Sequence, residues 1–545
     1  MIVTVLNNPQ LLFLSLVVIS QVALAVNVSS LASHLQSLSV DIFPGLKDIA
    51  IDVWENPEIG LDEHHAHDLV VEYFTEKRPK EWKVTPHAYG LPTAWKLETE
   101  IRTHPISPKS KLPAIGFLAE YDALVGIGHA CGHNHILLNG LTAASLTRQA
   151  LIDLKIPARI VVIGTPDEEN EAGKHLLQQA GAFNDIDIWL IAHPTSTNAI
   201  QPMNARINAI TTFTAPSHAE AVRKAYEALV LMRDRVAQGL PGTSSSVVPV
   251  EDVGMFESNV VQSQISLGIR GTTVESITYL VSSILDTTYP GVTFTATEDL
   301  TTFPDSPNNI NLTVFGPGGH ASENTKSPLV LTIETFRSLT ASPAPSPLTF
   351  YLPGNTTSPA LSLTFDIRSR YTHDLPAVLS LVTTLLSPSA SSISTDTIYP
   401  ALEVTPFLPD LFTSIITTPP YESQDFPIST FAPASTDASW IQNARVDPNT
   451  KMLLGADKVV FHPNFGICEP GSGACPFNHE PGFREVAGTE YSYGRTEIVA
   501  RALAHMAVLL VGDEGVMREA VAVLGGRGVG GGERDGGKGG SEWDY

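Results

Sequence analysis

Positively charged residues are scarce in this 545-residue chain. Lysine and arginine together number 33, against 57 aspartates and glutamates, which gives a net charge of −24 at pH 7. This excess of negative charge argues against nucleic acid or an anionic membrane as a partner. The chain also lacks the Gly-x-Ser-x-Gly motif that surrounds the nucleophile of many serine hydrolases, so a serine-hydrolase mechanism is disfavoured.

The apolar segment near the N-terminus is shorter than a membrane span. It runs from Leu11 to Ala25 and closes with Ala23-Leu24-Ala25, a small-x-small cleavage site. We therefore predict a signal peptide over residues 1–25, although no lysine or arginine precedes the apolar part. Three Asn-x-Ser/Thr sequons agree with a secreted glycoprotein or a protein of the secretory-pathway or vacuolar lumen, but such short motifs also arise by chance. They lie at Asn27, Asn311 and Asn355.

The chain has few cysteines, and each has an expected use. Cys131 lies among histidines, in a pattern that suits metal binding. If Cys131 holds a metal, Cys468 and Cys475 remain, and they bracket a loop of small residues. We expect these two to form a disulfide in an oxidising compartment.

A stretch rich in metal-ligand residue types lies between residues 114 and 134. Ala114 to Ala119 is an apolar run typical of a short buried strand. Two carboxylates follow it, Glu120 and Asp122, and a glycine-containing loop then carries His129-Ala130-Cys131-Gly132-His133. Thiolate, imidazole and carboxylate are the ligands of zinc-like metals. A buried cysteine with inert loop histidines is the alternative at this point.

Two further apolar runs end in similar residues. Arg159 to Thr165 precedes Glu168-Glu169, and Ile186 to Ala192 precedes His193. Helical segments expected over 136–153 and 173–182 separate the runs, so the order strand–helix–strand–helix–strand predicts a mostly parallel, helix-covered α/β sheet. Functional groups collect beyond the carboxyl ends of such strands. Three strand ends of this kind favour a metal site over a solvated charge cluster.

Residues 207–395 have a different texture, rich in Thr, Ser and Pro, and contain an internal repeat. The first copy is expected to hold His218, a helix over 223–236, a strand over 265–270 and a helix over 273–285. The second is expected to hold His320, a helix over 328–339, a strand over 363–368 and a helix over 375–386. We predict an inserted α+β lid that is duplicated. Chance similarity between two Ser/Thr-rich stretches is the alternative.

The chain thus divides into five predicted segments. They are a signal peptide (1–25), a first catalytic part (26–206), the lid (207–395), a second catalytic part (396–515) and a glycine-rich tail (516–545) that cannot bury a core. The second catalytic part contains Asn478-His479-Glu480 and a long apolar helix expected over 489–511.

In combination, these motifs resemble the zinc aminoacylase/carboxypeptidase-like metallopeptidases, specifically their amidohydrolase branch. Glu120-Tyr121-Asp122-Ala123-Leu124 with His129 to Asn134 is most similar to its β-alanyl-type dipeptidase/aminoacylase-like subgroup, and Trp54 to His67 looks like the N-terminal region of that subgroup. The resemblance implies ligands for two divalent ions, zinc in the first place with manganese or cobalt as alternatives. The implied ligands are Cys131, His133, Glu169, His193 and His479.

The resemblance also implies the catalytic groups. Glu168 corresponds to the general base and Asp122 to the carboxylate that steadies a ligand, while His218 and His320 both match the lid histidine that stabilises the oxyanion. His320 is favoured because its loop is glycine-rich. Arg270 or Arg368 is a candidate for binding a substrate carboxylate, and a purely structural role is equally compatible with the sequence.

The expected activity is a secreted, metal-dependent hydrolysis of an amide or peptide bond in a small peptide or N-acyl amino acid. A catalytically inactive relative with a binding or structural role is the alternative. Relatives usually dimerise through one lid unit, so a duplicated lid predicts a monomer, and a single lid unit predicts a homodimer.

Overall fold

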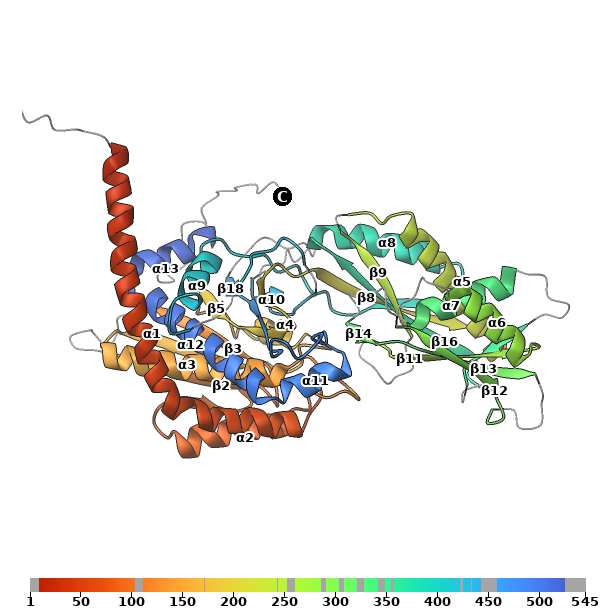
Figure 1. Ribbon diagram of the computed structural model, residues 1–545, viewed down its shortest axis with the longest axis horizontal. Helices are drawn as coiled ribbons and strands as arrows, with labels where there is room; N and C mark the ends of the chain where they lie inside the picture. Colours follow the sequence, from red (N-terminus) through yellow and green to blue (C-terminus); the bar gives the residue numbers. More distant parts are fainter. Residues whose placement is uncertain are drawn as a thin grey trace, which may run out of the picture.

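The computed structural model describes residues 9–102, 111–170, 172–242, 244–251, 260–285, 291–302, 308–320, 328–341, 348–353, 357–421, 425–432, 434–442 and 458–524, without the side chains of residues 9–29 and 249–251. The molecule has two lobes, with the catalytic part on one side and the lid on the other (Figure 1). Among the described residues, no helix is both long enough and apolar enough to span a membrane.

A six-stranded sheet forms the centre of the catalytic part, in the order β1-β2-β4-β3-β5-β18. Its strands span, in that order, Lys83–Thr85, Trp95–Ile101, Ala158–Gly164, Ala114–Ala119, Ile188–Leu190 and Val459–Phe461. The last four are mutually parallel, and β2 and β1 add an antiparallel edge. The three strands expected from the sequence are therefore neighbours, which confirms the mostly parallel sheet.

Both faces of this sheet are buried, as the unbroken apolar runs predict. Successive side chains of a strand point to opposite faces. Accordingly, Ile160 and Val162 join one hydrophobic cluster, whereas Val161 and Ile163 join another. The first face is covered by α1 (Pro9–Glu55), α3 (His133–Leu154) and α12 (Glu490–Gly512), and the second by α4 (Gly173–Gln179) and α10 (Ser439–Gln442).

Shorter elements complete the catalytic part. A three-stranded sheet has the order β6-β19-β7. In the sequence, β6 directly follows β5 and β19 directly follows β18. The bounds of these elements are β6 His193–Thr195, β7 Ala199–Ile200, β19 Pro463–Gly466, α2 His64–Glu72, α9 Leu408–Ile416, α11 Pro481–Ala487 and α13 Glu514–Ala520.

The lid is duplicated, but its two units are nested rather than in tandem. The outer unit has the sheet order β17-β8-β16-β9 and the inner unit the order β12-β13-β11-β15. The outer unit comprises β8 Ala205–Thr214, α5 His218–Ala237, β9 Ser246–Glu251, β16 Ala360–Ser369, α8 Leu375–Leu386 and β17 Ser392–Thr395. The inner unit comprises β11 Gln264–Arg270, α6 Val274–Leu285, β12 Thr293–Glu298, β13 Asn309–Phe315, α7 Pro328–Ala341 and β15 Thr349–Tyr351.

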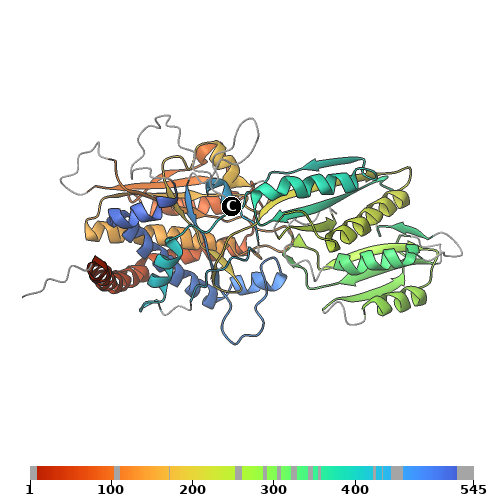
Figure 2. The same cartoon turned by 90° about the horizontal axis from the view of Figure 1, so that it is seen from above.

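This nesting corrects the expected grouping of the repeat. The expected helices and strands exist, but β11 does not share a sheet with β8. Instead β16 pairs antiparallel with β8 over its whole length, from Ala360 opposite Thr214 to Ser369 opposite Ala205. Each unit is β-α-β-β-α-β with the same strand order, so the inner unit is an insertion between β9 and β16. The two units lie side by side (Figure 2).

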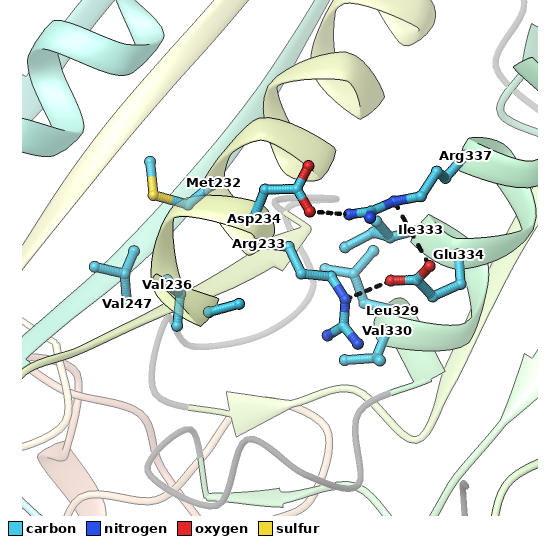
Figure 3. Close-up of a pocket in the computed structure, with 11 residues that line it drawn as sticks. Met232, Arg233, Asp234, Val236, Val247, Leu329, Val330, Ile333, Glu334 and Arg337 are labelled. Carbon is cyan, nitrogen blue, oxygen red and sulfur yellow. Dashed lines mark hydrogen bonds and ion pairs between the residues drawn. The ribbon is translucent and has the colours of Figure 1, made fainter. Parts of the chain in front are cut away.

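The two lid units meet along α5 and α7. Arg233 Nε lies 2.6 Å from Glu334 Oε1, and Arg337 Nη2 lies 2.6 Å from Asp234 Oδ1. These ion pairs stand over a cavity of about 360 Å³ whose apolar wall includes Met232 (Figure 3). The four charged side chains are paired with one another across the junction. We therefore interpret this cavity as a gap between packed units and not as a reaction site.

The chain ends differ in part from expectation. α13 begins at Glu514 and continues into the predicted tail as far as Ala520. Met517 and Leu524 pack into the main hydrophobic cluster, so the packed chain extends beyond residue 516. The rest of the predicted tail, residues 525–545, and the sequon at Asn355 lie outside the described residues. Cys468 and Cys475 form the expected disulfide.

Candidate metal centre

Four chain segments bring the predicted ligands together at the carboxyl ends of the parallel strands. Cys131 and His133 follow β3, Glu169 follows β4 and His193 follows β5, while His479 comes from the loop after the disulfide. All five side chains supply ligand atoms to groups in which the atoms lie within 4.8 Å of one another. These groups are Cys131 with His133 and His193, Cys131 with Glu169 and His479, and His133 with Glu168 and Glu169.

The turn between Cys131 and His133 depends on a glycine. Gly132 has φ +83°, and a Cβ there would lie 2.7 Å from Pro194 Cγ. Glycine therefore provides both the left-handed backbone and the close approach of the His193-Pro194 segment. As a result Cys131 Sγ lies 3.5 Å from His193 Nε2, although the two residues are 62 positions apart.

Asp122 orients two of the ligands. His133 Nδ1 donates a hydrogen bond to Asp122 Oδ1 over 2.8 Å, and the backbone N–H of Glu169 donates to Asp122 Oδ2 over 3.0 Å. Because a carboxylate only accepts, the proton of the neutral ring is on Nδ1, and Nε2 is left with its lone pair. That Nε2 is buried without a hydrogen bond among the described residues.

Further contacts close the ligand cluster. His479 Nε2 lies 3.3 Å from Glu169 Oε1, and His133 Nε2 lies 3.7 Å from the same oxygen. Asn478 donates from Nδ2 to the carbonyls of Cys131 and Pro194, each over 3.0 Å, and so ties the His479 loop to two other loops. This role of Asn478 cannot be predicted from the sequence, because only the folded loops reveal these contacts.

The electrostatics of the cluster are those expected of a site built for cations. Burial, then the charge of Glu169, raises the pKa of the Cys131 thiol well above its ordinary value. Burial, then Glu169 and Asp437, likewise raises the pKa of Glu168, and burial lowers the pKa of His193 to about 3. Buried thiolates and carboxylates are stable only when paired or bound to metal, so the donor set fits divalent cations.

Glu168 lies next to a buried ionic network that the sequence analysis did not identify. The Asp437 backbone N–H donates to Glu168 Oε1 over 3.3 Å. Lys174 Nζ lies 2.5 Å from Asp437 Oδ1 and 2.6 Å from Glu120 Oε1, and all three side chains are buried. Tyr399 donates its hydroxyl to the Glu168 carbonyl over 2.8 Å. These contacts fix the Glu168 backbone and side chain.

The two lid histidines have different positions. His320 lies on β14 (Gly319–His320), which pairs with β10 (Val260–Val261) at the end of the lid that faces the catalytic part (Figure 1). Its ring is 4.6 Å from that of His479, centroid to centroid. His218 instead accepts from the Leu352 N–H through Nε2 and contacts the Ser358 carbonyl through Nδ1, inside the lid.

A cavity of about 300 Å³ opens onto this cluster. Its wall contains Cys131, Glu168, Glu169, His193, Thr195, Ser196, Thr197, Gln201, Met203, His320, Phe431, Ala434, Ser435, Thr436, His462, Asn464, Phe477, Asn478 and His479. Arg270 and Arg368, the two residues considered from the sequence for binding a substrate carboxylate, do not line this cavity. Arg270 donates to Asn309, and Arg368 is buried behind the wall, where it pairs with Asp366 and donates to Ser435.

Comparison with known proteins agrees with this geometry. Part of the chain is 44% identical over 158 residues to the human Xaa-Arg dipeptidase, covering 27% of this chain and 35% of that protein. It is also 28% identical over 169 residues to one component of the p-aminobenzoyl-glutamate hydrolase of Escherichia coli (strain K12), covering 27% and 32%. Over this matched part, the chain is similar to amidohydrolase-type metallopeptidases. The matched part spans about a third of the length of these relatives, and no protein-family model matches the chain.

Two solved structures of low sequence identity align with most of the chain. A putative aminohydrolase from methicillin-resistant Staphylococcus aureus gives a TM-score of 0.49 at 13% identity, covering 88% of this chain and 98% of that one. A Bacillus subtilis protein described as a dinuclear metal-binding peptidase of the M20 family gives 0.37 at 13% identity, covering 84% and 97%.

Proposed function

We propose that this protein is a metal-dependent hydrolase that cleaves the amide or peptide bond of a small substrate, a dipeptide or an N-acyl amino acid. The observation that carries this proposal is the convergence of Cys131, Glu169, His193 and His479 with Glu168 on one cavity. His133 lies in the same ligand groups, with Cys131 and His193 and with Glu168 and Glu169. The names of the matched dipeptidase and aminobenzoyl-glutamate hydrolase support the same reaction class. The five ligands suit two divalent ions, zinc first and manganese or cobalt as alternatives.

When bound, a pair of divalent cations makes a water molecule acidic and polarises the substrate carbonyl. Glu168 takes a proton from that water and passes it to the departing nitrogen, so one carboxylate serves as base and then as acid. Its oxygen is held by the Asp437 N–H, which keeps the side chain facing the cavity. Asp122 holds His133 and Glu169 so that their ligand atoms converge.

His320 is the lid residue assigned to the oxyanion. It lines the same cavity as Glu168, whereas His218 is absent from the lining and is held by Leu352 and Ser358. Burial, then the neighbouring ring of His479, lowers the pKa of His320 well below its ordinary value. A neutral imidazole donates one hydrogen bond, which strengthens as negative charge develops on the carbonyl oxygen.

The inner lid unit makes the protein a self-sufficient monomer in this proposal. It supplies His320 to the site of its own chain, so no partner chain is needed to complete the residues named above. The ion pairs between α5 and α7 join the two lid units within one chain. Analytical ultracentrifugation at micromolar concentration is expected to give the monomer mass, and a stable dimer would contradict this part of the proposal.

A secretory route is also part of the proposal. It is supported by the disulfide between Cys468 and Cys475 and by the first part of α1, which extends away from the body of the molecule (Figure 1). Expression of the full chain in a eukaryotic host is expected to release protein that begins at Val26. A product that retains residues 1–25 would contradict the predicted cleavage.

Substitution of Glu168 by glutamine tests the hydrolase directly. With metal content unchanged, Glu168→Gln is expected to lower kcat on a panel of dipeptides and N-acyl amino acids by about 10²–10⁴-fold. Glu98→Gln is the matched control, because Glu98 pairs with Lys96 and Arg159 and does not line the cavity. Full activity in Glu168→Gln would remove the assigned base. A wild-type protein that binds metal and ligands but hydrolyses nothing would instead be the inactive relative.

A further inference from the structure

Two polar residues in the cavity wall have no role in the chemistry described so far. His462 follows β18 and Asn464 lies on β19, and their exposed fractions are 5% and 2%. Both line the cavity together with Glu168. Neither ring nitrogen of His462, nor Oδ1 of Asn464, forms a hydrogen bond with another described residue.

Such atoms are costly to bury. A buried donor or acceptor that lacks a hydrogen-bond partner destabilises a fold. Burial alone does not indicate a ligand. The ring of His129 is also buried with no hydrogen bond to a residue that the structure describes, and His129 does not line the cavity. His462 and Asn464 differ because both reach the cavity and because they are two residues apart in an extended segment, which places them on the same side.

The subsite lies directly beside the metal ligands. The ring of His462 stacks on that of His193, with centroids 5.8 Å apart and planes inclined by 29°. Asn464 is the strand partner of His193 in the parallel pairing of β19 with β6. A group bound by His462 and Asn464 would therefore sit next to the bond that is cleaved.

The cavity wall indicates the charge of that group. No lysine, arginine or aspartate is among the described residues that line the cavity, and its two glutamates belong to the metal centre. The nearby Lys174 is already paired with Glu120 and Asp437. Neutral imidazole and amide groups each offer both a donor and an acceptor, which matches an uncharged polar group better than an isolated ion.

From these contacts we infer that His462 and Asn464 form a hydrogen-bonding subsite for an uncharged polar group of the substrate, a hydroxyl or an amide, next to the scissile bond. This inference rests on the proposed hydrolase function and narrows its substrate class. The mouth of the cavity suits an apolar remainder, since Phe431 and Phe477 line it and are 70% and 41% exposed.

The test uses two pairs of probes with a leucine side chain. In the first pair, N-lactoyl-leucine carries a hydroxyl on the acyl half that N-propionyl-leucine lacks. In the second pair, N-propionyl-leucinamide carries a carboxamide on the amine half where N-propionyl-leucine carries a carboxylate. The wild-type protein is expected to show one of two preferences, either for N-lactoyl-leucine in the first pair or for N-propionyl-leucinamide in the second. The expected preference is about 10-fold in kcat/KM, as one good hydrogen bond allows. Alanyl-leucine, with an ammonium group in place of the hydroxyl, is expected to be a poorer substrate than the favoured probe.

Variants then assign the preference to the subsite. His462→Phe keeps the ring stacked on His193 but removes its hydrogen bonds, and Asn464→Leu keeps the approximate volume. Each is expected to bring the favoured ratio close to 1 and to leave the other ratio unchanged. His462→Gln, which keeps a donor and an acceptor, is expected to restore most of the preference. His175→Phe, outside the cavity, is the matched control, and metal content is measured for every variant.

The outcomes separate the inference from the function on which it rests. Hydrolysis with ratios that His462→Phe and Asn464→Leu leave unchanged would overturn the subsite alone. Equal changes in both ratios would also overturn the subsite, because they would mean that the substitutions disturb the whole active site. A wild-type preference for alanyl-leucine over the favoured probe would overturn it as well. If the metal-loaded wild-type protein hydrolysed none of the probes and no member of a wider dipeptide panel, the hydrolase proposal would fail as well.

Discussion

Glu63 offers a quantitative test of how the site is held together. Its side chain is fully buried, and Oε1 accepts the backbone N–H of Asp167 over 2.8 Å. Oε2 accepts the hydroxyl of Thr93, also over 2.8 Å. Asp167 has φ +60° and directly precedes Glu168, so Glu63 braces a strained turn next to the proposed base.

Burial, then the charge of Asp122, raises the pKa of Glu63 from 4.5 to about 8. Between these two values the folded protein keeps a proton that the unfolded chain has released, so the stability of the fold falls as pH rises toward 8. The slope is about 1.4 kcal/mol per pH unit for one proton. From pH 5.5 to pH 8 this group should therefore remove about 3 kcal/mol from the free energy of unfolding.

Glu63→Gln should abolish this loss while keeping the geometry. The glutamine oxygen can accept the Asp167 N–H, and its NH₂ can donate to Thr93. We expect urea unfolding of the chelator-treated proteins, followed by tryptophan fluorescence, to show that the wild type loses about 3 kcal/mol more than Glu63→Gln between pH 5.5 and pH 8. Equal pH dependence in both proteins would refute a neutral, buried Glu63.

Three further substitutions test the site. Asp122→Asn should weaken metal binding by about 10–100-fold in a competition assay with a chromogenic chelator, since it disturbs the ligands His133 and Glu169; unchanged affinity would exclude the orienting role. His320→Gln should lower kcat by about 10²–10³-fold with metal retained, whereas His218→Gln should lower the melting temperature and leave kcat nearly unchanged. The opposite pattern would reverse the assignment of the two lid histidines.

The sequence predicted the parts of the site that follow local patterns. The apolar runs that became β3, β4 and β5 are long enough to identify as strands, and in a parallel sheet their carboxyl ends meet at one edge. That rule already placed Cys131, Glu169 and His193 together. His479 could be added only through a family resemblance, because its loop reaches the site by tertiary contacts, including its N–H to the Ala130 carbonyl.

The parts that were missed depend on long-range pairing and burial. The strand 363–368 has the same local pattern whether it pairs with β8 or with β11, so only the folded sheets reveal the nesting. The roles of Asn478, Lys174 and Glu63 are likewise hidden in sequence, because a polar residue becomes informative only when its partners are known. The contact of His462 with the cavity is hidden for the same reason, since it depends on how β19 pairs with β6.

The most direct measurement is the metal content of the purified protein, combined with anomalous diffraction from its crystals. We expect two divalent cations per chain, held by Cys131, His133, Glu169, His193 and His479. Protein that takes up no divalent metal under saturating conditions, or cations bound away from Cys131 and His479, would contradict this expectation.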